Sequence, residues 1–309
     1  MKNFKKLIFT LFLLTIFCPS ISFCNDDIKL IPMGKVVYIY SFLKYPVVDS
    51  VLSDSAKTLK CEDVVLSVDC ESKGKATTLN DMQNIMKLEK EKINVNILRD
   101  GKSKTLLMNS DELRLYQLSS LSAGLGTITA IDKNGNFIGL SHELSSVKNN
   151  IDFEKIKVHE TGFIQQRKSS KDDVGFLVAN GVGNSLGEII KVNNFGVKGY
   201  FTNFKYNAKQ ALSVARPKLG KAYILCTDPV TSELNLHEIE VTKVEDDFST
   251  IKVVDDSLLK FRGGIVKGMS GSPVIQDNKI IGGVRSTKIS NPVEGHITNI
   301  DSMLGINLK

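Results

Sequence analysis

Short apolar runs alternate with turn residues over the second part of the chain. From about residue 111 onward, runs such as Phe137–Leu140, Lys221–Cys226 and Leu236–Val244 follow one another closely, and apolar residues at helical spacing are nearly lacking. Short apolar stretches bounded by turn residues are typical of β-strands. Strands at this density predict a barrel or a sandwich, so the fold class is mainly β.

The preceding region, residues 28–110, has a mixed pattern that predicts a small α+β module. Strands are expected at Lys29–Ser41 and Asp63–Val68, and Ile93, Val95 and Ile97 alternate as in a half-buried strand. Between them, apolar residues at Leu79, Met82, Ile85 and Met86 recur at helical spacing, and Thr78 or Asn80 is expected to cap that helix.

The first 27 residues have the pattern of a targeting segment. Lys2, Lys5 and Lys6 precede the apolar run Leu7–Cys18, which Pro19 interrupts. A basic start followed by such a run predicts a signal peptide or a membrane anchor. The positive-inside rule then places the rest of the chain outside the cytoplasm, membrane-anchored or secreted.

Composition narrows the function classes. The chain has 309 residues, 42% of them hydrophobic, which is enough for roughly two folded domains. The net charge of +6 is spread over lysines interleaved with acidic residues, so a nucleic-acid partner is not expected. No cysteine or histidine cluster has zinc spacing. His142-Glu143 begins a His-Glu-x-x-His pattern, but Ser146 stands where the second zinc ligand is needed, so metalloprotease chemistry is not expected. Neither a metal site nor a cofactor is therefore expected.

One loop has the character of a nucleophile site. Ser270 stands in Gly268-Met269-Ser270-Gly271-Ser272-Pro273-Val274, between two glycines and ahead of an apolar strand. A serine nucleophile needs an exposed Oγ, small neighbours, and backbone N–H groups that can hold an oxyanion. Glycine adopts backbone angles forbidden to other residues, which suits such a loop. The alternative interpretation is an ordinary turn between strands.

A serine nucleophile needs a base, and His142 is the best candidate among four histidines. It directly follows the strand expected at Phe137–Leu140, whose hairpin turn is Asn134-Gly135. His159 and His237 lie among charged residues and are expected at the surface. His296 follows a glycine and has weaker support as a site residue.

Several motifs together resemble one peptidase family. Gly-Leu-Ser-His-Glu-Leu at 139–144 and Gly-Gly-Ile-Val-Lys-Gly-Met-Ser-Gly-Ser-Pro-Val-Ile-Gln-Asp at 263–277 are similar to the stage IV sporulation protein B serine peptidases. Flanking matches lie at 30–34, 122–127 and 291–295. The resemblance implies a PDZ-like domain at 28–110 and a chymotrypsin-like double β-barrel at 111–309, after the segment 1–27.

The resemblance also implies residue roles. It maps the nucleophile onto Ser270, the base onto His142 and an orienting carboxylate onto Asp255, with Asp256 or no carboxylate as the open alternatives. Backbone N–H groups of Gly268 and Ser270 are expected to form the oxyanion hole. The chain departs from the family at Ser141, where glycine is usual, and at Val284-Arg285-Ser286-Thr287, where a histidine is common.

The implied PDZ-like domain predicts peptide binding. Such domains add an extended peptide to a sheet edge and hold its C-terminal carboxylate in a backbone nest. Only Met33-Gly34-Lys35 offers such a nest in this region.

The function implied is limited proteolysis of a membrane-associated signalling protein during endospore formation, in the space between mother cell and forespore. Two alternatives remain open. One is an inactive, peptidase-like scaffold that binds partners through its PDZ-like module. The other is a general envelope quality-control protease, although those usually carry the PDZ module after the protease.

Overall fold

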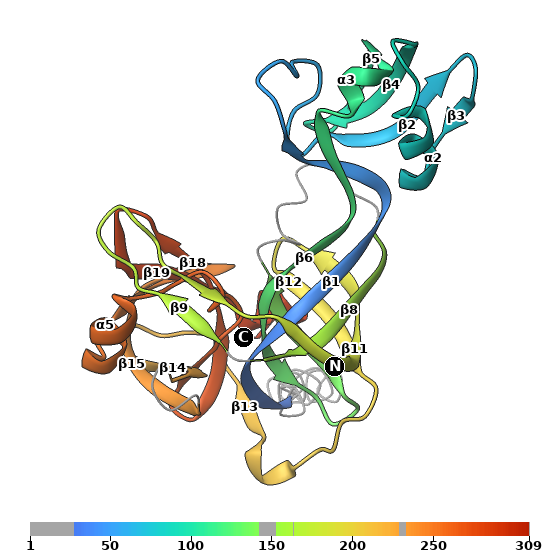
Figure 1. Ribbon diagram of the computed structural model, residues 1–309. Coiled ribbons are helices and arrows are strands. Elements are labelled where there is room, and N and C mark those ends of the chain that lie inside the picture. Colours follow the sequence, from blue (N-terminus) through green and yellow to red (C-terminus); the bar gives the residue numbers. More distant parts are fainter. Residues whose placement is uncertain (1–27, 142–152, 163, 229–232, 309) are drawn as a thin grey trace, which may run out of the picture.

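The computed structural model describes residues 28–141, 153–162, 164–228 and 233–308. Strands dominate this part of the chain, as the apolar pattern predicted, and helices are short. Figure 1 shows two strand-rich bodies side by side and a smaller module joined to one of them by two long strands, β1 and β6.

The first body is a closed, antiparallel six-stranded barrel. Each strand pairs with two neighbours in the ring β1–β6–β7–β12–β11–β8–β1. Its core is formed by inward-facing residues such as Val37, Ile128 and Phe137. The expected turn at Asn134-Gly135 joins two of its strands, with Gly135 at a φ of 85°. The strands are β1 (Lys29–Val51), β6 (Tyr116–Ile131), β7 (Asn136–Ser141), β8 (Phe153–Thr161), β11 (Gly181–Asn193) and β12 (Gly196–Phe201).

The second body is another closed six-stranded barrel, with the ring β14–β15–β16–β19–β18–β17–β14. Asp277 and Asn278 both have positive φ at the hairpin that joins two of its strands, because that kind of turn matches the strands' twist. The strands are β14 (Gly220–Thr227), β15 (Leu234–Val244), β16 (Phe248–Val253), β17 (Pro273–Gln276), β18 (Lys279–Lys288) and β19 (Asn291–Asn299). The accompanying elements are β9 (Gln165–Arg167), β10 (Phe176–Val178), η1 (Ala208–Gln210), β13 (Leu212–Val214), α5 (Asp256–Arg262) and α6 (Ile300–Leu304).

The small module has its own hydrophobic core, which includes Val65, Met82 and Ile93. Its helix begins where the sequence predicted, because the Thr78 side chain accepts a hydrogen bond from the Asp81 N–H. The elements are β2 (Val64–Cys70), β3 (Gly74–Ala76), α2 (Leu79–Ile85), β4 (Lys92–Arg99), β5 (Lys102–Asn109) and α3 (Ser110–Leu113).

Strand β1 runs continuously from the first barrel into the small module. Residues from Ile31 to Phe42 pair with β6, and residues from Val37 to Leu43 also pair with β8, both barrel strands. Only further along, at Val47, does β1 pair with β2 of the module. One continuous strand thus serves two bodies. The division into domains at 28–110 and 111–309 stays a prediction. That the module is a PDZ domain stays a prediction.

Two sequence predictions fall on residues outside this description. The targeting segment 1–27 and His142 are not among the described residues. Within the described ranges, no helix is long and apolar enough to cross a membrane.

Candidate active site

The loop that carries Ser270 has the conformation that its glycines predicted. Gly268 and Gly271 have φ values of 98° and 99°, which side chains rarely permit. The loop closes on itself, because the Ser272 N–H donates to the Met269 carbonyl at 2.9 Å. Ser270 lies at its centre with only 5% of its surface exposed.

Strand β6 of the first barrel holds this loop, which belongs to the second. The Thr127 N–H donates to the Ser270 carbonyl, and the Thr127 hydroxyl to the Gly268 carbonyl, each at 3.0 Å. The Thr129 hydroxyl donates to the Gly271 carbonyl at 2.7 Å. Both threonines can reach the loop because side chains alternate along a strand, and Ile128 between them points into its own barrel. The Ser270 loop therefore lies at the contact between the two barrels.

Gly271 fits only because it has no side chain. A Cβ there would lie 2.0 Å from the Thr127 carbonyl oxygen and 2.9 Å from the Leu140 nitrogen. Leu140 is near the end of β7, which finishes at Ser141. The chain thus leaves the first barrel beside the serine loop, directly before the position of the predicted base.

The backbone donors of the loop divide into two groups. The N–H groups of Met269, Gly271 and Ser272 are occupied by carbonyls of Val266, Val284 and Met269. In the described part of the chain, no acceptor is bonded to the N–H groups of Gly268 and Ser270. Those two are the donors that the sequence assigned to the oxyanion hole.

The Ser270 hydroxyl itself donates to the backbone carbonyl of Arg285, with an Oγ–O distance of 3.1 Å. Arg285 lies on β18, within the stretch where the sequence departs from the family. A hydroxyl has one proton to donate, so this bond keeps it from any other acceptor.

Asp255 lies in a different setting. It caps the N-terminus of α5, where its Oδ1 accepts hydrogen bonds from the Leu258 N–H at 2.8 Å and the Ser257 hydroxyl at 2.5 Å. The same oxygen lies 3.2 Å from Nδ1 of His237. Burial raises the pKa of the Asp255 carboxyl, but the hydrogen bonds from Ser257, Leu258, His237 and Glu238 together outweigh burial and lower this pKa to about 2.

The structure brings Asp255 together with His237 and not with the serine loop. In Figure 1, α5 lies on the side of the second barrel that is remote from β6, the strand that holds Ser270. The neighbouring Asp256 belongs to the first turn of α5. The role of either aspartate as the orienting carboxylate stays a prediction.

The predicted surface position of His237 is wrong. Its side chain is buried, with 2% of the residue exposed, and its Nε2 has no partner among the described residues. The neighbouring charges point outward while His237, Ile239 and Val241 share the buried face of β15. That spacing of two was the signal in the sequence. Of the other histidines, His159 is partly buried and His296 is exposed.

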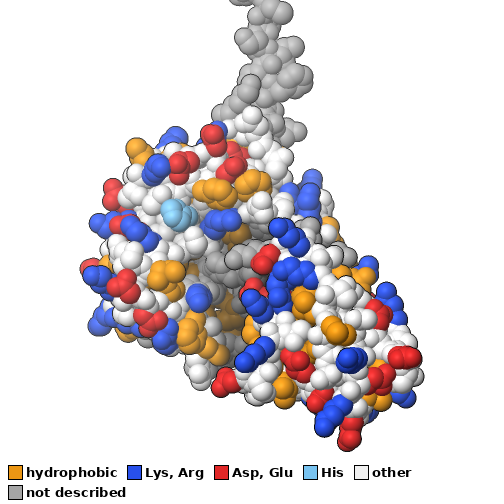
Figure 2. Space-filling model, turned by 90° about the horizontal axis from the view of Figure 1, so that it is seen from above, with side chains coloured by type: hydrophobic (Ala, Val, Ile, Leu, Met, Phe, Trp, Pro, Cys, Tyr) orange, Lys and Arg blue, Asp and Glu red, His pale blue; other side chains and the backbone are white. Residues whose placement is uncertain are grey.

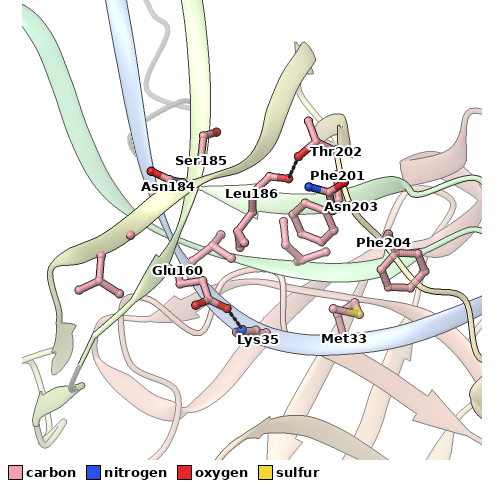
Figure 3. A pocket seen from close by; sticks show the side chains of 14 residues that line it. Met33, Lys35, Glu160, Asn184, Ser185, Leu186, Phe201, Thr202, Asn203 and Phe204 are labelled. Carbon is pink, nitrogen blue, oxygen red and sulfur yellow. Dashed lines mark hydrogen bonds and ion pairs between the residues drawn. The ribbon is translucent and has the colours of Figure 1, made fainter.

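The residues predicted to hold a peptide C-terminus lie on β1, in the first barrel. Met33 and Lys35 line a cavity of about 500 Å³ (Figure 3), together with Phe201 and Phe204. The Lys35 ammonium is paired with the Glu160 carboxylate at 2.7 Å. Between the two lining residues, Gly34 has a φ of 60° and leaves no room for a Cβ beside the Leu225 carbonyl. Peptide binding at these residues stays a prediction.

The described ranges contain no group of three or more histidine, cysteine, aspartate or glutamate side chains that could hold a metal ion. On the face shown in Figure 2, lysine and arginine side chains are interspersed with aspartate and glutamate.

Comparisons with solved structures give likenesses of low identity. The active form of the Rv3671c protease from M. tuberculosis has 13% identity and a TM-score of 0.37, covering 60% of this chain and 72% of that one. The HtrA-type protease AlgW with a tripeptide has 10% identity and a TM-score of 0.37, covering 60% and 55%. Deg5 has 13% identity and a TM-score of 0.32, covering 60% and 80%. At these low scores the likenesses carry no argument about activity.

The family comparison is more informative. No curated protein matches the chain. The model of the SpoIVB peptidase S55 family matches residues 112–304, which hold both barrels' strands from β6 onward and the Ser270 loop. The chain therefore belongs to the SpoIVB peptidase S55 family and is a serine peptidase.

Proposed function

We propose that Ser270 is the nucleophile of this peptidase and His142 its general base. Ser270 Oγ attacks a peptide carbonyl carbon while its proton passes to His142, which then protonates the leaving amine. Water then attacks the acyl-enzyme while His142 accepts its proton, and His142 returns that proton to Ser270 Oγ as the acid product leaves. The observation that carries this proposal is the serine loop. Its two glycines have positive φ, and the N–H groups of Gly268 and Ser270 have no acceptor among the described residues.

The biological role in this proposal is limited cleavage of a membrane-associated signalling protein during endospore formation. The family of the chain supports the sporulation setting. The basic and apolar pattern of residues 1–27 supports a location outside the cytoplasm, in the space between mother cell and forespore. In this proposal the small module, which has its own hydrophobic core, binds protein partners as the implied PDZ-like domain would.

The test uses the purified full chain and a fluorophosphonate that reacts with activated serines, together with a protein substrate. Ser270→Ala abolishes both labelling and cleavage, and His142→Ala lowers both by at least about a thousandfold. Ser272→Ala is the matched control, because it removes a second buried hydroxyl from the same loop. Labelling that persists in Ser270→Ala, or that disappears in Ser272→Ala alone, would show that the nucleophile is misassigned.

A second candidate function is an inactive scaffold that binds partners. One observation favours it: the Ser270 hydroxyl is buried and donates to the Arg285 carbonyl. The same experiment separates the two functions, since a scaffold takes up no fluorophosphonate while still binding its partner. A peptidase of the quality-control type would instead degrade many unfolded proteins without selectivity.

A further inference from the structure

The side chain of Arg285 crosses from the second barrel to the first. Its guanidinium donates to the backbone carbonyl of Asn194, in the turn between β11 and β12. It also stacks over the ring of Phe248, the first residue of β16, with 4.6 Å between Cζ and the ring centre. Phe195 from the same turn lies 6.0 Å from that ring. Arg285 is thus part of a contact between the barrels that joins Asn194 and Phe195 to Phe248.

The backbone of Arg285 contacts the serine loop of its own barrel. Its carbonyl accepts the hydroxyl of Ser270. The residue sits at a break in register, because Val284 pairs with Ile297 and Ser286 with His296, which leaves Arg285 without a partner in that ladder. Such bulges re-aim a side chain and locally free the backbone. One residue therefore touches both the other barrel and the nucleophile.

We propose that Arg285 is a positioning residue that couples the packing of the two barrels to the state of the Ser270 hydroxyl. While the guanidinium lies between Asn194 and Phe248, the Arg285 carbonyl holds the hydroxyl in a resting orientation. Displacement of the turn at Asn194 frees the bulge, and the hydroxyl then turns to its base. This inference rests on the proposed role of Ser270.

Physical chemistry supports the dependence on the partners. Arg285 is half-buried, and this burial lowers its pKa. The Asn194 carbonyl and the Phe248 ring compensate the buried part of the guanidinium for lost water contacts. The hydroxyl bond is a single neutral hydrogen bond, whose net strength corresponds to a change of about three- to tenfold in an equilibrium. A change of that size is the expected effect on serine reactivity.

The experiment measures the second-order rate of fluorophosphonate labelling of the full chain, which needs no bound peptide. Arg285→Ala is expected to raise this rate about three- to tenfold. Phe248→Leu removes the ring on which the guanidinium stacks, and it is expected to raise the labelling rate less. The double variant is expected to label at the rate of Arg285→Ala, because both changes break the same contact. Lys288→Ala is the control, because this exposed cation of the same strand is paired with Glu294 and not with the other barrel.

The outcomes separate the two levels of the proposal. A wild-type chain that takes up no label refutes the role of Ser270. Labelling that is unchanged or slower in both Arg285→Ala and Phe248→Leu, with only a lower melting temperature, shows that Arg285 is a structural tie and overturns the inference. If Arg285→Ala does not fold, Arg285→Lys and Phe248→Leu provide the same comparison.

Discussion

Ser270 and Asp255 belong to the same barrel, but they are held in different ways. The serine loop is fixed by Thr127 and Thr129, which come from the other barrel. Asp255 is fixed by groups of its own barrel, chiefly the first turn of α5 and His237. One arrangement spans the contact between two bodies, whereas the other is local.

The difference indicates what each arrangement is for. In the described part of the chain, the serine loop leaves the N–H groups of Gly268 and Ser270 without acceptors, and this does not stabilise a fold. Glycine at positive φ also loses more chain entropy on folding than other residues do. A carboxylate with four hydrogen-bonding partners at a helix N-terminus is a good way to stabilise a fold. We therefore expect changes at the serine loop to affect turnover, and changes at Asp255 to affect mainly stability.

Among changes that leave Ser270 and His142 in place, the largest effect is expected for Gly271→Ala. Its Cβ would meet the Thr127 carbonyl at 2.0 Å, so the loop must move away from β6. A displacement of about 1 Å lowers catalytic efficiency by about a hundredfold, measured as kcat/KM on a peptide substrate. Gly74→Ala is the matched control, since Gly74 also has positive φ, 74°, but nothing lies within 4 Å of its Cβ position. That variant should lose about 1 kcal/mol of stability and no activity. If Gly271→Ala and Gly74→Ala lowered kcat/KM equally, the contact of the serine loop with β6 would have no special role in catalysis.

A smaller effect is expected for Thr127→Val. This nearly isosteric change removes the hydroxyl that holds the buried Gly268 carbonyl. The Gly268–Met269 peptide, which lies between the two proposed oxyanion donors, is then less firmly held. We expect kcat to fall about tenfold with little change in KM, because only transition-state stabilisation is lost. Thr298→Val is the control: its hydroxyl is equally buried but has no partner among the described residues. A similar fall in kcat for both would mean that the hydroxyl bond itself is unimportant.

Local rules made much of the site predictable from sequence. Positive φ angles occur where residue types favour them: at the glycines around Ser270, at Gly135, and at the Asp277-Asn278 turn. The contacts of Thr127 and Thr129 could not be read in the same way. They join positions 141 and 142 residues apart, and a threonine in a strand carries no sign of its partner.

Two other features were missed for physical reasons that differ. His237 appeared exposed because its neighbours are charged, but the period of two along β15 places those charges on the outer face. The strand expected at Lys29–Ser41 continues to Val51. Along it the partner β8 gives way to β2, while β6 pairs with it from Ile31 to Val51. Sequence pattern reports which face is buried, not which body buries it.

The smallest effect on turnover is expected for Asp255→Asn. Because the pKa of Asp255 is lowered to about 2, its carboxylate stabilises the fold fully above its ordinary pKa of about 4. That stabilisation is lost as the pH falls from about 4 toward 2. Asparagine still caps a helix but carries no charge, so the variant should lose about 1 kcal/mol at neutral pH and should lack this part of the acid dependence.

Urea unfolding of both proteins between pH 7 and pH 2 measures the difference, and Asp256→Asn is the matched control on the adjacent residue. We expect kcat of Asp255→Asn to stay within about tenfold of the wild type. A carboxylate that orients the catalytic histidine would behave differently, since its amide replacement lowers kcat by about 10⁴ with the fold intact. A fall of that size without a change in unfolding would make Asp255 the orienting carboxylate after all. It would also mean that the contacts of Asp255 with Ser257 and His237 belong to a resting state, which rearranges before catalysis. Both regions would then serve catalysis, and they would differ only in needing or not needing that rearrangement.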